Sequence, residues 1–169
     1  MPRAQRGFSL IEVIVVIMLV GIISVTAASR MMGSSGFDAY VARDQAISIA
    51  RQIQVMGMNQ AINTPSDDPS QCLALKITSD YFGSLSCSSN QDFSRWLSTD
   101  NDKVSFAINN GISTMYFDIL GRPFMFNRNN QKVAICQSAT CEVTFTSRSN
   151  EQATMCINAE GYMWSGVCS

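Results

Sequence analysis

The stretch FSLIEVIVVIMLVGIISVTAA, residues Phe8–Ala28, decides the fold of this 169-residue chain. It carries a single charge, Glu12. As an α-helix it would be about 31 Å long, close to the hydrocarbon thickness of a bilayer. Arg3 and Arg6 precede the stretch and Arg30 follows it. It therefore predicts a transmembrane helix, and the positive-inside rule places the short basic leader in the cytoplasm and the remaining chain beyond the membrane.

Glu12 is the residue of this stretch that requires a reason. A carboxylate inside an apolar helix is unfavourable by roughly 2.5–3.5 kcal/mol on insertion scales, so a partner is expected. A cut after Gly7 would create a free α-amine on Phe8, about 6 Å along the helix from Glu12. The amine of a neighbouring chain, shifted by about one turn, would pair with this Glu12 and fix the stagger between the chains. The alternative is a tolerated glutamate that snorkels to the membrane interface.

The sequence RG-FSLIE followed by an apolar helix resembles the class III signal of type IV prepilins and type II secretion pseudopilins. The resemblance rests on the short basic leader, on Gly7 and Phe8, and on Glu12 as the fifth residue after the cut. It implies cleavage between Gly7 and Phe8 by a prepilin peptidase, N-methylation of Phe8, and transfer of the helix from the membrane into a filament core. The alternative is an ordinary secretory signal that is cut near SVTAAS.

The chain is expected to have four segments: a leader at 1–7, the hydrophobic helix at 8–29, an amphipathic helix at 30–62 and a disulfide-bonded β-rich domain at 63–169. A break is expected at Gly33–Gly36 because glycine weakens helices. The stripe of the amphipathic helix comprises Phe37, Tyr40, Val41, Ile47, Ala50, Ile53 and Met56/Gly57. Short alternating segments follow, so the predicted class is α+β, a long N-terminal helix followed by a small antiparallel, sandwich-like sheet.

The six cysteines all lie between Cys72 and Cys168. An even number in an exported domain favours disulfides and an oxidising periplasm. Zinc is disfavoured because there is no histidine and no Cys-x-x-Cys pair. Six cysteines allow fifteen pairings. Spacing favours the sequential set, Cys72–Cys87, Cys136–Cys141 and Cys156–Cys168.

Two further motifs, FDILGRP (residues 117–123) and AEGYMWSGVC (residues 159–168), resemble the globular domain of GspH/FimT-like minor pilins and pseudopilins. The cysteine-rich body is similar to the MshC-like minor pilins of the mannose-sensitive haemagglutinin (MSHA) pilus. These resemblances imply a structural or assembly-initiating subunit. Its partners would be other pilins through their N-terminal helices, the prepilin peptidase and the inner-membrane assembly platform. Its location would be the inner membrane, with a periplasmic C-terminus, and then the pilus.

Three alternatives to a structural pilin stay open: a GspH-like pseudopilin, a pilus-borne adhesin, and a DNA-uptake subunit. Tyr162 and Trp164 could stack on a sugar if they are exposed. DNA binding is not expected, because no Lys or Arg follows Arg148 and the other basic residues are scattered among acids.

Catalysis, cofactors and metal ions are not expected. The absence of histidine removes the commonest general base and metal ligand. A Ser-Lys dyad is compatible with the composition, but no motif points to one. The acidic pairs Asp67-Asp68 and Asp100/Asp102 lie in polar segments, where they are expected to cap turns.

Overall fold

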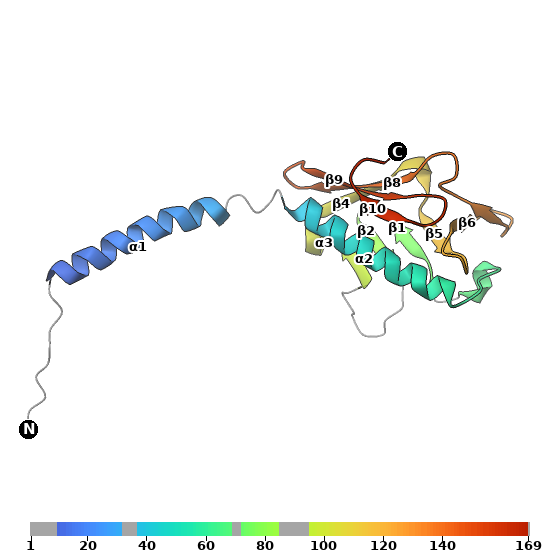
Figure 1. Ribbon diagram of the computed structural model, residues 1–169, viewed down its shortest axis with the longest axis horizontal. Coiled ribbons are helices and arrows are strands. Elements are labelled where there is room, and N and C mark those ends of the chain that lie inside the picture. Colours follow the sequence, from blue (N-terminus) through green and yellow to red (C-terminus); the bar gives the residue numbers. More distant parts are fainter. Residues whose placement is uncertain (1–9, 32–36, 69–71, 85–94, 169) are drawn as a thin grey trace, which may run out of the picture. The chain divides into compact units, whose positions relative to one another are not determined.

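The structure is a computed structural model that describes residues 10–31, 37–68, 72–84 and 95–168, with only the backbone of residues 25–31. The chain divides into two compact units, residues 1–35 and 36–169. The described part of the first unit is helix α1 (Leu10–Met31) (Figure 1). The leader and the break expected at Gly33–Gly36 lie outside the described residues.

The second unit combines a long helix with short antiparallel strands, so the α+β class with antiparallel sheets is confirmed. Its helices are α2 (Asp38–Met58), the 3-10 turns η2 (Pro65–Asp67) and η4 (Asn109–Gly111), and α3 (Thr99–Asp102). Its strands are β1 (Leu75–Ile77), β2 (Tyr81–Ser84), β3 (Trp96–Ser98), β4 (Val104–Ile108), β5 (Thr114–Phe117), β6 (Pro123–Phe126), β7 (Lys132–Ala134), β8 (Cys141–Ser147), β9 (Gln152–Ile157) and β10 (Met163–Ser165).

The described strands form two sheets. One has six strands in the order β3-β2-β1-β5-β6-β7, and the other has four in the order β10-β9-β8-β4. Strands β5 and β6 form a hairpin whose turn contains GRP, with Phe117 opposite Pro123. In β8 the residues Cys141, Val143 and Phe145 are buried and alternate with half-buried neighbours, which is the pattern of a strand with one face on a core.

Helix α2 lies against strands of both sheets (Figure 1). Its buried face is made of small residues and two isoleucines: Ala39, Ala42, Ala46, Ile49, Ala50, Ile53 and Gly57. The close approach is measurable at Gly57, where a Cβ would lie 2.9 Å from the carbonyl oxygen of Phe117. Small side chains let the helix backbone lie near the strands, and this explains which face is buried.

The predicted stripe of α2 is therefore wrong in its first half. Phe37, Tyr40 and Val41 are 70%, 41% and 52% exposed, whereas the alanines beside them are buried. The prediction placed the large apolar side chains on the buried face. In the structure the face of α2 that packs on the strands is the one whose small side chains allow close contact. The helix also ends at Met58, well before Pro65, so proline does not terminate it.

Three phenylalanines join the two sheets in one core. Phe82 on β2 lies 5.8 Å from Phe145 on β8 and 6.1 Å from Phe106 on β4, measured between ring centroids. All three rings are buried. The sheets thus contact each other directly, and α2 covers the same core. Strands β2 and β3, of four and three residues, were not predicted from the sequence.

Among the residues that the structure describes, no helix is long and apolar enough to cross a membrane. This finding differs from the span expected at 8–29.

Candidate functional site

Helix α1 presents apolar side chains on all sides. Its large apolar residues between Leu10 and Ile23 are between 38% and 77% exposed. They follow one another along the chain and do not form a single stripe. A helix that is apolar on every side is normally covered by other apolar groups. The helix is therefore suited to association with further helices or with lipid.

Glu12 lies in the first turn of α1 and is exposed. A negative charge at this end is favourable because the helix dipole is positive there. No ion pair to Glu12 is present among the described residues. Gly7 and Phe8 lie outside the described residues, so the cleavage site and the methylated residue stay predictions.

The globular unit contains a five-residue hairpin turn that recurs four times in its described part. In each turn the first residue receives a backbone hydrogen bond from the fourth, and the fourth residue has a positive φ of 58° to 81°. The side-chain oxygen of the first residue accepts from the backbone N–H of the fifth, at 2.8–3.2 Å. This is the geometry of a three-residue hairpin loop with a left-handed bulge residue. The turns span residues 118–122, 127–131, 147–151 and 158–162.

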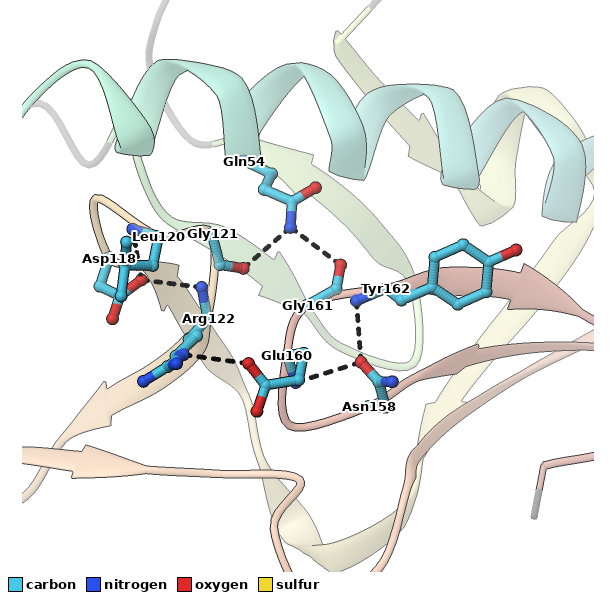
Figure 2. Close-up of polar contacts among 9 residues, drawn as sticks. All are labelled: Gln54, Asp118, Leu120, Gly121, Arg122, Asn158, Glu160, Gly161 and Tyr162. Atoms are coloured by element: carbon cyan, nitrogen blue, oxygen red, sulfur yellow. Dashed lines mark hydrogen bonds and ion pairs between the residues drawn. The ribbon is translucent and has the colours of Figure 1, made fainter.

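Two of these turns meet beneath α2, and both belong to motifs quoted from the sequence. The side-chain amide of Gln54 donates to the carbonyl oxygens of Gly121 and Gly161, at 2.8 Å each (Figure 2). The structure therefore brings FDILGRP and AEGYMWSGVC together through one residue of α2. We call Gln54 with the turns 118–122 and 158–162 the clasp.

In the clasp, the fourth residue of the second turn must be glycine because it lies very close to the first turn and to Gln54. A Cβ on Gly161 would lie 1.9 Å from the carbonyl oxygen of Gly121 and 2.6 Å from Nε2 of Gln54. The other two turns carry exposed asparagines, Asn130 and Asn150, at the same position and also with a positive φ, 58° and 63° against 80° and 81° for the two glycines. The backbone conformation therefore tolerates asparagine, and proximity is what excludes a side chain at Gly161.

The outer side of the clasp carries one ion pair and two exposed apolar side chains. Arg122 Nε donates to Glu160 Oε2 at 3.1 Å, and both side chains are more than half exposed. Ile119 and Leu120, at the tip of the first turn, are each 61% exposed. The exposed ion pair between Arg122 and Glu160 contributes little to stability, so the hydrogen bonds of Gln54 are the stronger link between the two turns.

Tyr162 and Trp164 stack on each other, with ring centroids 5.7 Å apart and planes at 21°. Tyr162 is 63% exposed, whereas Trp164 is half-buried and donates its indole N–H to the carbonyl oxygen of Val167. Trp164 thus has a structural role in the C-terminal loop. The sugar-stacking hypothesis retains only Tyr162 as an exposed ring.

The structure contains the disulfides Cys136–Cys141 and Cys156–Cys168, both members of the sequential set. Cys72 is disulfide-bonded. Its expected partner, Cys87, lies outside the described residues.

Three of the four residues in the acidic pairs, Asp67, Asp68 and Asp102, act as turn and capping groups. Asp67 accepts from the N–H groups of Thr64 and Asn63, and these hydrogen bonds lower the pKa of its carboxyl. The buried Asp68 accepts from the N–H groups of Cys72 and Leu73. Asp102 likewise accepts from Ser98 N–H. Within the described parts of the chain, no three His, Cys, Asp or Glu side chains gather to hold a metal ion.

Comparison with known proteins gives one match. Residues 2–28 match the family described as the prokaryotic N-terminal methylation motif. This match covers the basic leader, Gly7, Phe8, Glu12 and the apolar segment, and it supports a type IV prepilin- or pseudopilin-like N-terminus. No curated protein and no solved structure matches the chain.

Proposed function

We propose that this protein is a minor pilin of an MSHA-type pilus, cut by prepilin peptidase after Gly7 and N-methylated at Phe8. The proposal gives the chain a structural or assembly-initiating role and no catalytic one. The observation that carries it is α1, a helix with apolar side chains exposed on every side and one carboxylate in its first turn. The methylation motif at residues 2–28 supports the same reading.

The proposed life of the subunit has two stages, each of which covers α1 with apolar groups. Lipid covers the helix first, while the chain is anchored in the inner membrane with its C-terminal unit in the periplasm. Helices of other pilins cover it after the assembly platform extracts it into the filament. Helices suit both surroundings because their backbone groups are bonded internally.

Glu12 sets the axial position of the subunit in this proposal. Once Phe8 is the first residue, its α-amine lies about one helical turn from the carboxylate. The amine of one subunit and Glu12 of the next then pair at a single stagger. Other staggers leave a charge unpaired in apolar surroundings, which is unfavourable by several kcal/mol.

Mass measurement tests the processing step. The chain is produced in a host with a prepilin peptidase, and the product from its membranes is analysed by intact mass and N-terminal sequencing. The expected product begins at Phe8 and is heavier by one methyl group. Cleavage near Ala28 would make the chain an ordinary secreted protein and refute the proposal.

Replacement of Glu12 tests the assembly step. Glu12→Gln keeps the size of the side chain but removes its charge, so processing should continue while incorporation into filaments falls about tenfold or more. Glu142→Gln makes the same change on β8 and should assemble normally. Filament content is measured by immunoblotting of sheared pili. Equal incorporation of both variants would contradict the pairing.

A further inference from the structure

A cleft in the globular unit opens between α2, β3 and α3. Its volume is about 440 Å³, within the range of roughly 300–1,000 Å³ found for small-molecule sites. Its floor is apolar, formed by the side chains of Ile49 on α2 and Leu97 on β3, each 3% exposed. The cleft is thus built on the core of the domain and on elements of fixed position.

The rim of the cleft is polar. Three residues of α2, spaced to lie on one face of the helix, form one side: Gln45, Ser48 and Gln52. Asn101 and Asp102 on α3 form the other side. In the described parts of the chain, the side chains of Gln45, Ser48, Gln52 and Asn101 make no hydrogen bond. Several donors and acceptors therefore converge without a protein partner.

Trp96 lines the same cleft and is half-buried. Its ring stacks on Tyr81 at a centroid distance of 6.0 Å with planes at 15°. The hydroxyl of Tyr81 in turn donates to the carbonyl oxygen of Ser84 at 2.6 Å. The ring of Trp96 is thus held in a fixed orientation beside the polar rim.

The chemistry of the lining selects the class of ligand. Side-chain amides and a hydroxyl supply both donors and acceptors, and Asp102 supplies an acceptor. No Lys or Arg is among the described residues that line the cleft, where Asp102 is the charged side chain. Two arginines, Arg51 and Arg95, line an adjoining hollow that shares Ser48 and Gln52 with the cleft. The cleft itself therefore favours an uncharged ligand. A flat aromatic ring next to uncharged donors and acceptors suits the apolar face and the hydroxyl groups of a pyranose. We propose that this cleft binds a neutral oligosaccharide.

The test observes the two tryptophans of the full-length chain. The chain is labelled with ¹⁵N at the indole and kept in a detergent without a sugar headgroup. It is then titrated with maltotriose, cellotriose and chitotriose, and with sialyllactose as the acidic comparison. The expected result is a saturable shift of the Trp96 resonance with at least one neutral trisaccharide, while Trp164, in the C-terminal loop, stays unchanged.

Substitution on the rim gives the matched comparison. Gln52→Ala removes one amide and should weaken binding about tenfold. Gln137→Ala removes an exposed amide in the Cys136–Cys141 loop and should leave the affinity unchanged. The proposal is overturned if no neutral trisaccharide shifts Trp96 at concentrations up to about 10 mM. Preference for sialyllactose, or an unchanged affinity in Gln52→Ala, overturns it equally.

Discussion

Replacing Gly161 by asparagine separates the effect of close packing in the clasp from the effect of backbone conformation. Asparagine already occupies the same position, with φ of 58° and 63°, in the turns that contain Asn130 and Asn150. The backbone penalty of Gly161→Asn is therefore small, at most about 1 kcal/mol. What remains is the contact of the new side chain with the facing turn.

The magnitude follows from the geometry at Gly161. Its Cβ would lie 1.9 Å from the carbonyl oxygen of Gly121, where ordinary contact begins at 3.4 Å, so the turns must separate by about 1.5 Å. The two hydrogen bonds of Gln54, now 2.8 Å each, cannot both survive that movement. Loss of one such bond costs about 1 kcal/mol and overpacking about 1–3 kcal/mol. Gly161→Asn should thus lower the free energy of unfolding by roughly 2–4 kcal/mol.

The assay is urea unfolding of the full-length chain in micelles, followed by tryptophan fluorescence. Asn150→Gly is the control, because it makes the reverse change in an exposed turn and should alter stability by no more than about 0.5 kcal/mol. Gly121→Asn should lie between the two, because its Cβ would meet only side-chain atoms of Gln54 and Met58, at 3.0 Å and 3.3 Å. A Gly161→Asn protein as stable as Asn150→Gly would refute the clasp as a close-packed contact.

Three further perturbations test other parts of the domain by the same unfolding measurement. Gln54→Ala leaves two carbonyl oxygens without their donor and should lower the free energy of unfolding by about 1–3 kcal/mol. Gln54→Glu should lower it further at pH 7 and regain stability in acid, where its carboxyl is protonated. An equal loss of stability for Gln54→Glu at both pH values would contradict the donor role. Burial raises the pKa of Tyr81 and Tyr116, and the Asp68 carboxylate adds to the rise for Tyr116. Stability should therefore be intact below about pH 10 and fall above it, because the unfolded chain ionises first, and Tyr116→Phe should flatten that fall. Replacing Cys156 and Cys168 by serine removes a disulfide that spans 12 residues and should lower the free energy of unfolding by about 2–4 kcal/mol. The same change at Cys136 and Cys141, which are 5 residues apart, should cost less. The reverse order would count against loop entropy as the source of the stabilisation.

The N-terminal signature could be read from the sequence because each of its parts is local. A leader, Gly7, Phe8, Glu12 and an uninterrupted apolar run need no knowledge of the rest of the chain. The strands with strict alternation, such as β8, were predicted for the same reason. What Glu12 pairs with depends on another molecule, and so it stays a proposal.

The packing of α2 could not be read from periodicity, because the pattern weighs large apolar residues above small ones. In the structure the alanines face the sheets, and Phe37, Tyr40 and Val41 face away from the core. Gln54 was missed as well, since a single glutamine in a helix has no signal until the two turns that it joins are placed. The glycine in each turn motif was a visible signal, but it indicated only a turn.

The contacts of α2 with the last hairpin have a consequence for the order of events during biosynthesis. Arg51 and Gln54 bond to the carbonyl oxygens of Met163 and Gly161, which lie 112 and 107 residues later in the chain. The ribosome makes α2 early, yet these bonds cannot form until nearly the whole globular unit has been synthesised. Contacts of such long sequence separation slow folding. Through that interval the alanine-lined face of α2 would be without the covering that the last strands complete.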